Sequence, residues 1–94
     1  MKIIYRYEIR ANRESIVALP KGGQILSVAC WKQGLCFWAL VDTDQPNEDR
    51  HILAIGTGLP FPDSENLKAD FIGMCMVDVY QEIYNVFELT QISA

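Results

Sequence analysis

Hydrophobic and polar residues alternate along much of this chain with the two-residue period that is typical of β-strands. Residues 2–10 are the clearest case, because one side carries Ile3, Tyr5, Tyr7 and Ile9. The opposite side is charged, apart from Ile4. Further strands are expected at residues 14–19, 51–55, 71–79 and 82–89, since each is a short, largely apolar run between turn-forming residues.

The stretches between these strands are rich in turn formers. Pro20 to Gly23 interrupts the chain, and residues 59–66 are expected to form a loop in which Asp63 or Ser64 is suited to cap one helical turn. Residues 79–90 also fit a helical spacing, but their β-branched and aromatic content favours a strand. The chain therefore predicts an all-β domain of about seven mostly antiparallel strands, with at most one short helical turn, folded as a compact sandwich or half-open barrel.

Residues 25–42 are predicted to form a β-hairpin that is apolar on both faces. Gly34 favours a turn at Gln33-Gly34, which sets Trp31 opposite Cys36. One face then carries a typical core set, namely Leu26, Val28, Cys30, Leu35, Phe37, Ala39 and Val41. The other face carries Ile25, Ser27, Ala29, Trp31, Cys36, Trp38 and Leu40, with Trp31 and Trp38 diagonally across the pair.

Two interpretations of this second face remain open. In the first, a helix or a second sheet covers it, because strands buried on both sides are often apolar throughout. In the second, Trp31, Cys36 and Trp38 form an exposed interface flanked by Ile25 and Leu40. Exposed aromatic patches often mark binding surfaces, so the second interpretation predicts a partner that meets this face.

Length and charge narrow the class of protein. Ninety-four residues predict a single β domain over residues 1–94, and a chain that is 50% hydrophobic is not a disordered one. The net charge of −4 and the scattered Lys and Arg do not favour nucleic-acid binding. No signal peptide or membrane span is expected. Cys30, Cys36 and Cys75 are expected to be reduced thiols in a cytoplasmic protein, with Cys30 and Cys36 on opposite faces of the hairpin.

Two candidates for catalysis or metal binding are weak. His51 is the sole histidine, and no nucleophile stands at a catalytic spacing from it. The loop after Asp42 starts like a calcium loop, but Pro46 takes a ligand position and Asn47 takes the place of the glycine that such a loop needs. We therefore expect no catalytic residue, no bound metal and no cofactor.

Gly56, Thr57 and Gly58 form the one motif that suits a small ligand. Their backbone could supply contacts to a bound molecule, but the Leu59-Pro60 that follows does not fit a phosphate-binding loop. A bulge or tight turn at the end of a strand is the alternative interpretation of these glycines.

Five short motifs stand in order along the chain: P-K-G-x-x-I-L-S-V at 20–28, W-A-L-V-D at 38–42, G-T-G-x-P at 56–60, F-I-G at 71–73 and V-F-E at 86–88. Together they resemble a family of small proteins of tailed bacteriophages and prophages, a domain of unknown function. The resemblance implies a phage-encoded protein that works in the bacterial cytoplasm, and it implies no activity. Members often carry histidines where this chain has Leu59 and Asn85, so a histidine-based role is not expected here.

The leading expectation is a non-enzymatic binding module whose partner is a host protein, a phage protein or a second copy of the chain. A homodimer would cover the second apolar face of the hairpin, and two-fold dimers are the commonest oligomers. The family resemblance extends this expectation to inhibition of a host factor or defence system. The alternative is a small-molecule or nucleotide-binding β-barrel protein with Gly56, Thr57 and Gly58 at its site.

Overall fold

The computed structural model describes residues 1–32, 34–77 and 82–91, and within these ranges the side chains of residues 31 and 77 lie outside the description. Seven strands follow one another along the chain. They are β1 (Lys2–Ile9), β2 (Arg13–Pro20), β3 (Gln24–Trp31), β4 (Gly34–Asp42), β5 (Asn47–Gly56), β6 (Leu67–Val77) and β7 (Glu82–Gln91). The described residues contain no helix, so the all-β prediction is confirmed.

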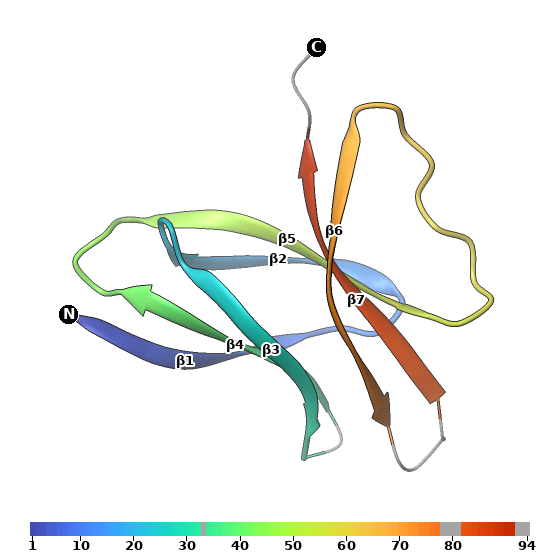
Figure 1. The fold of residues 1–94 in the computed structure, drawn as a ribbon, viewed down its shortest axis with the longest axis horizontal. Coiled ribbons are helices and arrows are strands. Elements are labelled where there is room, and N and C mark those ends of the chain that lie inside the picture. The colour runs from blue at the N-terminus through green and yellow to red at the C-terminus, as the bar shows by residue number, and fades with distance from the viewer. Residues whose placement is uncertain (33, 78–81, 92–94) are drawn as a thin grey trace.

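The strands form two antiparallel sheets (Figure 1). The first has three strands in the order β1-β4-β3, and the second has four in the order β2-β5-β7-β6. All five strand pairings are antiparallel. The predicted compact arrangement of antiparallel strands is therefore confirmed as a two-sheet sandwich, which buries the apolar side of each sheet against the other.

The core lies between the two sheets and draws on both of them. Its fully buried side chains, with exposed fractions below 2%, include Leu19, Phe37, Val41, Ile52 and Val86. The alternation of β1 is as predicted, since Ile3 and Tyr7 pack against the core cluster and Ile9 belongs to it. Burial of each large apolar side chain contributes roughly 1.5–3 kcal/mol, which is why strands with only one apolar face still hold the sandwich together.

The sheets meet at two places. At one corner the chain passes directly from β1 to β2, where Ala11 forms a parallel bridge with Ala54 and the Asn12 amide donates to the Ala54 carbonyl oxygen at 2.7 Å. At the opposite seam β3 and β6, the edge strands of different sheets, run side by side (Figure 1). A Cβ placed on Gly73 of β6 would lie 3.2 Å from Cγ2 of Val28 on β3, so the two edges are in close contact.

Two details differ from the sequence expectation. Strands β5 and β6 each begin four residues earlier than predicted, because polar residues can extend a strand once a neighbour supplies the hydrogen-bonded ladder. The helical turn expected near Asp63 is a hydrogen-bonded turn in which the Leu67 amide donates to the Ser64 carbonyl oxygen at 3.2 Å. Residues 82–91 form a strand, as favoured, whereas the expectations for residues 78–81 and 92–94 lie outside the described residues.

Candidate binding surfaces

The β3–β4 hairpin has a different register from the predicted one. Trp31 pairs with Gly34 and Cys30 pairs with Leu35, so Gly34 belongs to strand β4 and not to the turn. The prediction of a Gln33-Gly34 turn is wrong because Lys32 itself adopts a positive φ of 49° and so opens the turn one residue earlier. Residue 33 lies outside the described part of the chain.

This register separates the two tryptophans along the strands. Trp38 pairs with Ser27, which stands four residues before Trp31 on β3. At the usual rise per residue the two tryptophan backbones are therefore about 13 Å apart along the sheet, which is beyond diagonal contact range. The expectation of a Trp31–Trp38 pair is wrong, and the Trp31 side chain itself lies outside the description.

Two of the predicted interface residues are not accessible to a partner. Ile25 packs against the core because a bulge between Ile25 and Ser27 inserts one extra residue and turns Ile25 towards Ala39. The residue in the bulge, Leu26, is 44% exposed instead of buried. Cys36 faces outwards but is only 1% exposed, since it lies on the central strand of its sheet between Glu8 and Ala29.

The outer face of the three-stranded sheet keeps some apolar surface among its described side chains. Trp38 and Leu40 are half-buried there, and Ile4, which pairs with Leu40, is 54% exposed. Arg6 stands beside Trp38 on the neighbouring strand β1. Glu8 of β1 lies on the same face, which therefore mixes apolar groups with charges of both signs, and Trp38 and Leu40 are the predicted interface residues that remain partly exposed there.

A larger apolar surface lies on the outer face of the four-stranded sheet. We call it the outer patch, and its six side chains are exposed by 38–64%: Ile16, Phe61, Phe71, Met74, Met76 and Ile83. Five of them come from strands β2, β6 and β7, and Phe61 comes from the β5–β6 connection. At roughly 200 Å² for each large side chain, these exposed fractions amount to on the order of 600 Å² of apolar surface.

The β5–β6 connection packs against the centre of the outer patch through Phe61. The ring of Phe61 lies 5.0 Å from the ring of Phe87, and the ring of Phe71 lies 5.4 Å from the same ring, both edge-on. Leu53 and Leu89 are buried although they do not belong to the core cluster between the sheets. The aromatic cluster therefore covers part of the outer face and leaves its rim apolar and exposed.

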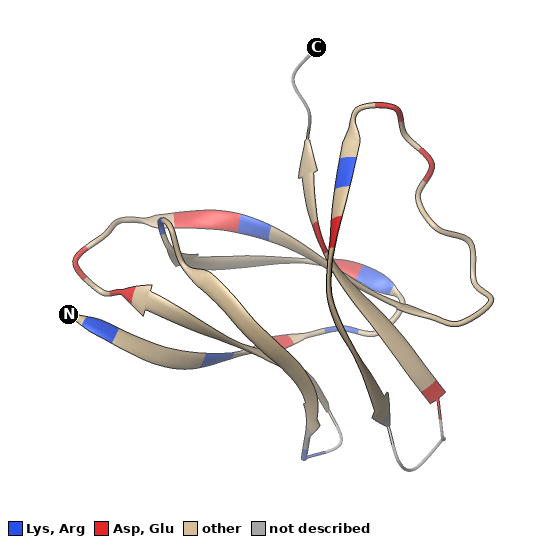
Figure 2. Cartoon of the chain, in the orientation of Figure 1, with Lys and Arg blue, Asp and Glu red and all other residues tan. Residues whose placement is uncertain are grey.

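The charges around the outer patch are acidic. Strand alternation places Glu14 and Asp49 on the outer face, and Asp63 and Glu65 lie in the β5–β6 connection (Figure 2). The Lys and Arg residues of the described part of this sheet, Arg13, Arg50 and Lys68, fall on the opposite, inward-facing parity. A partner for this surface would therefore be apolar at its centre and basic at its edge.

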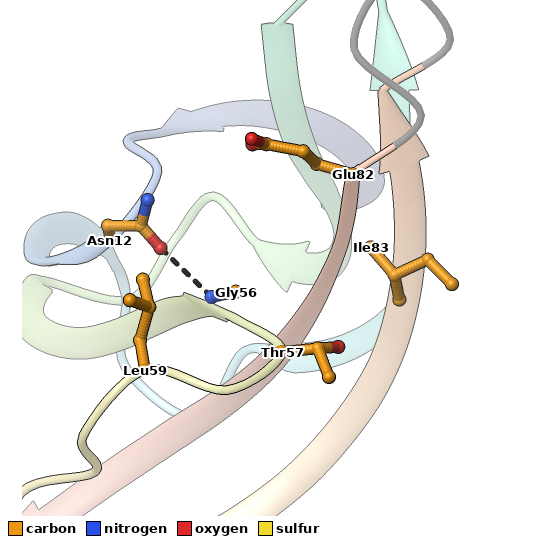
Figure 3. Close-up of a pocket in the computed structure, with 6 residues that line it drawn as sticks. All are labelled: Asn12, Gly56, Thr57, Leu59, Glu82 and Ile83. Atoms are coloured by element: carbon orange, nitrogen blue, oxygen red, sulfur yellow. Dashed lines mark hydrogen bonds between the residues drawn. The ribbon is translucent and has the colours of Figure 1, made fainter.

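Gly56 and Thr57 line a pocket of about 420 Å³ at the edge of the sandwich, together with Asn12, Leu59, Glu82 and Ile83 (Figure 3). Asn12 adopts a φ of 58° and its Oδ1 accepts a hydrogen bond of 2.9 Å from the Gly56 amide. Gly58 has a φ of 88° and is not a lining residue, so it serves the turn. The sequence therefore indicated two of the residues around this pocket and missed Asn12, because residues distant in sequence met only through the β1–β2 corner.

The remaining candidates have structural partners. His51 Nδ1 lies 2.5 Å from Glu14 Oε1, and the pair is exposed on neighbouring strands. The Asp42 and Asp44 carboxylates, from the loop that was weighed as a calcium loop, hold the Met1 ammonium at 3.1 and 2.9 Å. Within the described residues, no group of three or more His, Cys, Asp or Glu side chains is placed to hold a metal ion.

Residues 1–93 match a family model described as a domain of unknown function (DUF7352). The chain belongs to this family. The match covers nearly the whole sandwich, so the family shares this domain rather than a fragment of it. No curated protein and no solved structure gives a significant match. In the described part of the chain, no helix is long and apolar enough to cross a membrane.

Proposed function

We propose that this DUF7352 protein is a non-enzymatic binding module that associates with another protein through the outer patch. The observation that carries the proposal is the apolar area of that face, on the order of 600 Å², which approaches the surface that each partner buries in a stable complex. Exposed apolar surface of this size on one face of a monomer often has a binding role. The exposed Phe71 and Phe61 are of the residue type that supplies binding energy at interface centres.

The proposed partner is a protein surface with an apolar centre and Lys or Arg at its edge. The acidic rim of Glu14, Asp49, Asp63 and Glu65 favours this chemistry over a second copy of the chain. A two-fold dimer through the outer patch would place two acidic rims against each other, and this repulsion opposes association at low salt.

The cellular setting is part of the same proposal. The sequence motifs that resemble small proteins of tailed bacteriophages support a phage-encoded protein that acts in the cytoplasm of the bacterial host. Occlusion of a host factor or of a host defence protein would need only a binding face and no catalytic group. The absence of catalytic motifs from the sequence agrees with this non-enzymatic mode of action.

The proposal is tested with two synthetic peptides that share the same alternating leucines and differ only in having Lys or Glu between them. In a nuclear magnetic resonance titration, the Lys peptide should shift the amide signals of β2, β6, β7 and the β5–β6 connection, and the Glu peptide should bind at least about tenfold more weakly. The double variant Phe71→Ser/Met74→Ser should lose at least about tenfold of the affinity for the Lys peptide.

Ile4→Ser is the matched control, because Ile4 is 54% exposed on the outer face of the other sheet. It should bind the Lys peptide as the unchanged protein does. Equal binding of both peptides, or equal loss in the control, would show that the outer patch is not selective. Light scattering measures the oligomeric state. If the protein is a dimer that Phe71→Ser converts into monomers, the partner of the outer patch is a second copy of the chain and not a basic protein.

The pocket at Gly56 and Thr57 favours a second candidate function, the binding of a small molecule. Its volume of about 420 Å³ falls within the range of ligand sites, and the Thr57 hydroxyl and Glu82 carboxylate provide polar contacts. Native mass spectrometry of the protein purified from a bacterial host distinguishes the two functions. A small bound mass that Thr57→Val removes would support the ligand, whereas bare protein would leave the protein-binding proposal in place.

A further inference from the structure

Two of the three cysteines face the same interior from the two edge strands that meet at the β3–β6 seam. Cys30 of β3 pairs with the core residue Leu35 and packs against the core cluster. Cys75 of β6 belongs to that cluster and is 8% exposed. Cys36 points to the opposite side of its sheet, since it stands next to Leu35 on β4.

The alignment of the seam brings Cys30 and Cys75 to the same level. Strands β3 and β6 run in the same direction (Figure 1), and a Cβ placed on Gly73 would lie 3.2 Å from Cγ2 of Val28. Cys30 follows Val28 by two residues and Cys75 follows Gly73 by two residues, so equal steps along the strands place the cysteines side by side. Residue pairs across this seam have Cα atoms within 8 Å of each other, so the two edge strands are direct neighbours.

Strands β3 and β6 belong to different sheets, and no backbone hydrogen bond joins them among the described residues, so side-chain packing connects these two edges. All three cysteines are free thiols in the structure. Burial raises the pKa of the Cys75 thiol, and the Cys30 and Cys36 thiols raise it further.

We infer that Cys30 and Cys75 are an oxidisable pair, and that a small disulfide such as oxidised glutathione converts them into a covalent bond that closes the β3–β6 seam. The half-buried Cys30 attacks first, as a thiolate whose proton has passed to solvent, and it releases one glutathione thiolate. The deprotonated Cys75 then attacks the Cys30 sulfur of this mixed disulfide and displaces the second glutathione. Two thiols are oxidised and one glutathione disulfide is reduced to two thiols.

The test treats the purified protein with oxidised glutathione at mildly alkaline pH, where the Cys75 thiolate is more abundant. Mass spectrometry should show a loss of about 2 Da with no glutathione retained, and peptide mapping should find Cys30 linked to Cys75. The melting temperature should rise by at least about 5 °C, because the bond closes a long loop in the unfolded chain. A reducing agent should return it to its starting value.

Three variants make the result decisive. Cys30→Ala and Cys75→Ala should each abolish both the bond and the rise in melting temperature, and Cys36→Ala should keep both. If Cys75→Ala fails to fold, Cys30→Ala carries the test, since Cys30 is the less buried of the pair. A stable glutathione adduct on Cys30, or a bond between Cys30 and Cys36, would overturn the inference.

Discussion

At the scale of single residues, the most consequential polar group is Arg50. Its Nη2 donates to Glu88 Oε1 at 2.9 Å, its Nε donates to the other carboxylate oxygen, and its Nη1 donates to the Gly23 carbonyl oxygen at 2.9 Å. The Arg50 and Glu88 side chains are 18% and 20% exposed. The bidentate hydrogen bond to Glu88 raises the pKa of Arg50. The sequence pattern shows two charged residues here, and only the structure pairs them.

We expect Arg50→Ala to lower the free energy of unfolding by roughly 2–3 kcal/mol, because it leaves the Glu88 carboxylate largely buried and without its partner. Chemical denaturation followed by circular dichroism measures the change. Lys68→Ala is the control, since Lys68 and Asp70 lie 3.8 Å apart and are 61% and 57% exposed. Its effect should stay within about 0.5 kcal/mol, and equal losses in both variants would contradict the role given to Arg50.

At the scale of elements, strands were easier to foresee than the ways in which they join. The alternation in β1 and the apolar runs of β6 and β7 identified these strands because burial imposes a two-residue period. The hairpin register depended on Lys32 accepting a left-handed conformation and on the bulge at Leu26, and neither has a clear sequence signal. The turn between β2 and β3 shows the same dependence on packing, because Gly23 there lies against Leu19.

We expect Gly23→Ala to destabilise the fold by roughly 1–3 kcal/mol, since the added Cβ would lie 2.4 Å from Leu19 Cδ1 and 3.1 Å from Val41 Cγ1. A double-mutant cycle with Leu19→Val measures the clash directly. Removal of that methyl group should recover part of the loss, so the two changes together should cost less than their sum. Strict additivity would show that Gly23 is needed for a reason other than space.

At the scale of the whole molecule, the sandwich is flat and has two outer faces of different character. Its extents are 39 × 38 × 15 Å. The face of the three-stranded sheet carries Lys2 and Arg6, and that of the four-stranded sheet carries the outer patch and its acidic rim. A clasp joins the start of β1 to the β4–β5 loop, where Asp42 and Asp44 accept hydrogen bonds from the Met1 ammonium.

The clasp should raise the free energy of unfolding near neutral pH, and this contribution should be lost at both acidic and alkaline pH. The Asp44 amide and the Met1 ammonium lower the pKa of Asp42, so its contribution is present above about pH 4 and is lost as the pH falls through the lowered value. The hydrogen bonds to Asp44 and Asp42 raise the pKa of the Met1 ammonium, so its contribution is present below about pH 8 and is lost as the pH rises through the raised value.

Thermal unfolding across this pH range checks the clasp against Asp42→Asn/Asp44→Asn. The unchanged protein should melt higher near neutral pH, and the two melting curves should converge at both acidic and alkaline extremes. Other titrating groups contribute equally to both proteins, so their effects cancel in the difference. Among them are the buried Cys36 and Cys75 thiols, whose pKa values burial raises. A constant gap at all pH values would mean that the two carboxylates act without the ammonium.

The sequence by itself determined the strand content and the alternation of buried positions, because these follow from local periodicity and turn chemistry. It also pointed to Gly56 and Thr57 at a pocket. Only the tertiary structure decided which apolar surplus stays exposed. The prediction chose the β3–β4 hairpin, yet Cys36 is buried between its neighbours on the central strand β4, and Ile25, next to the bulge, packs against the core. Among the described residues, the larger exposed apolar surface lies on β2, β6 and β7. Exposure depends on which faces of the sheets have no covering layer. That in turn depends on strand order, which local sequence patterns do not specify.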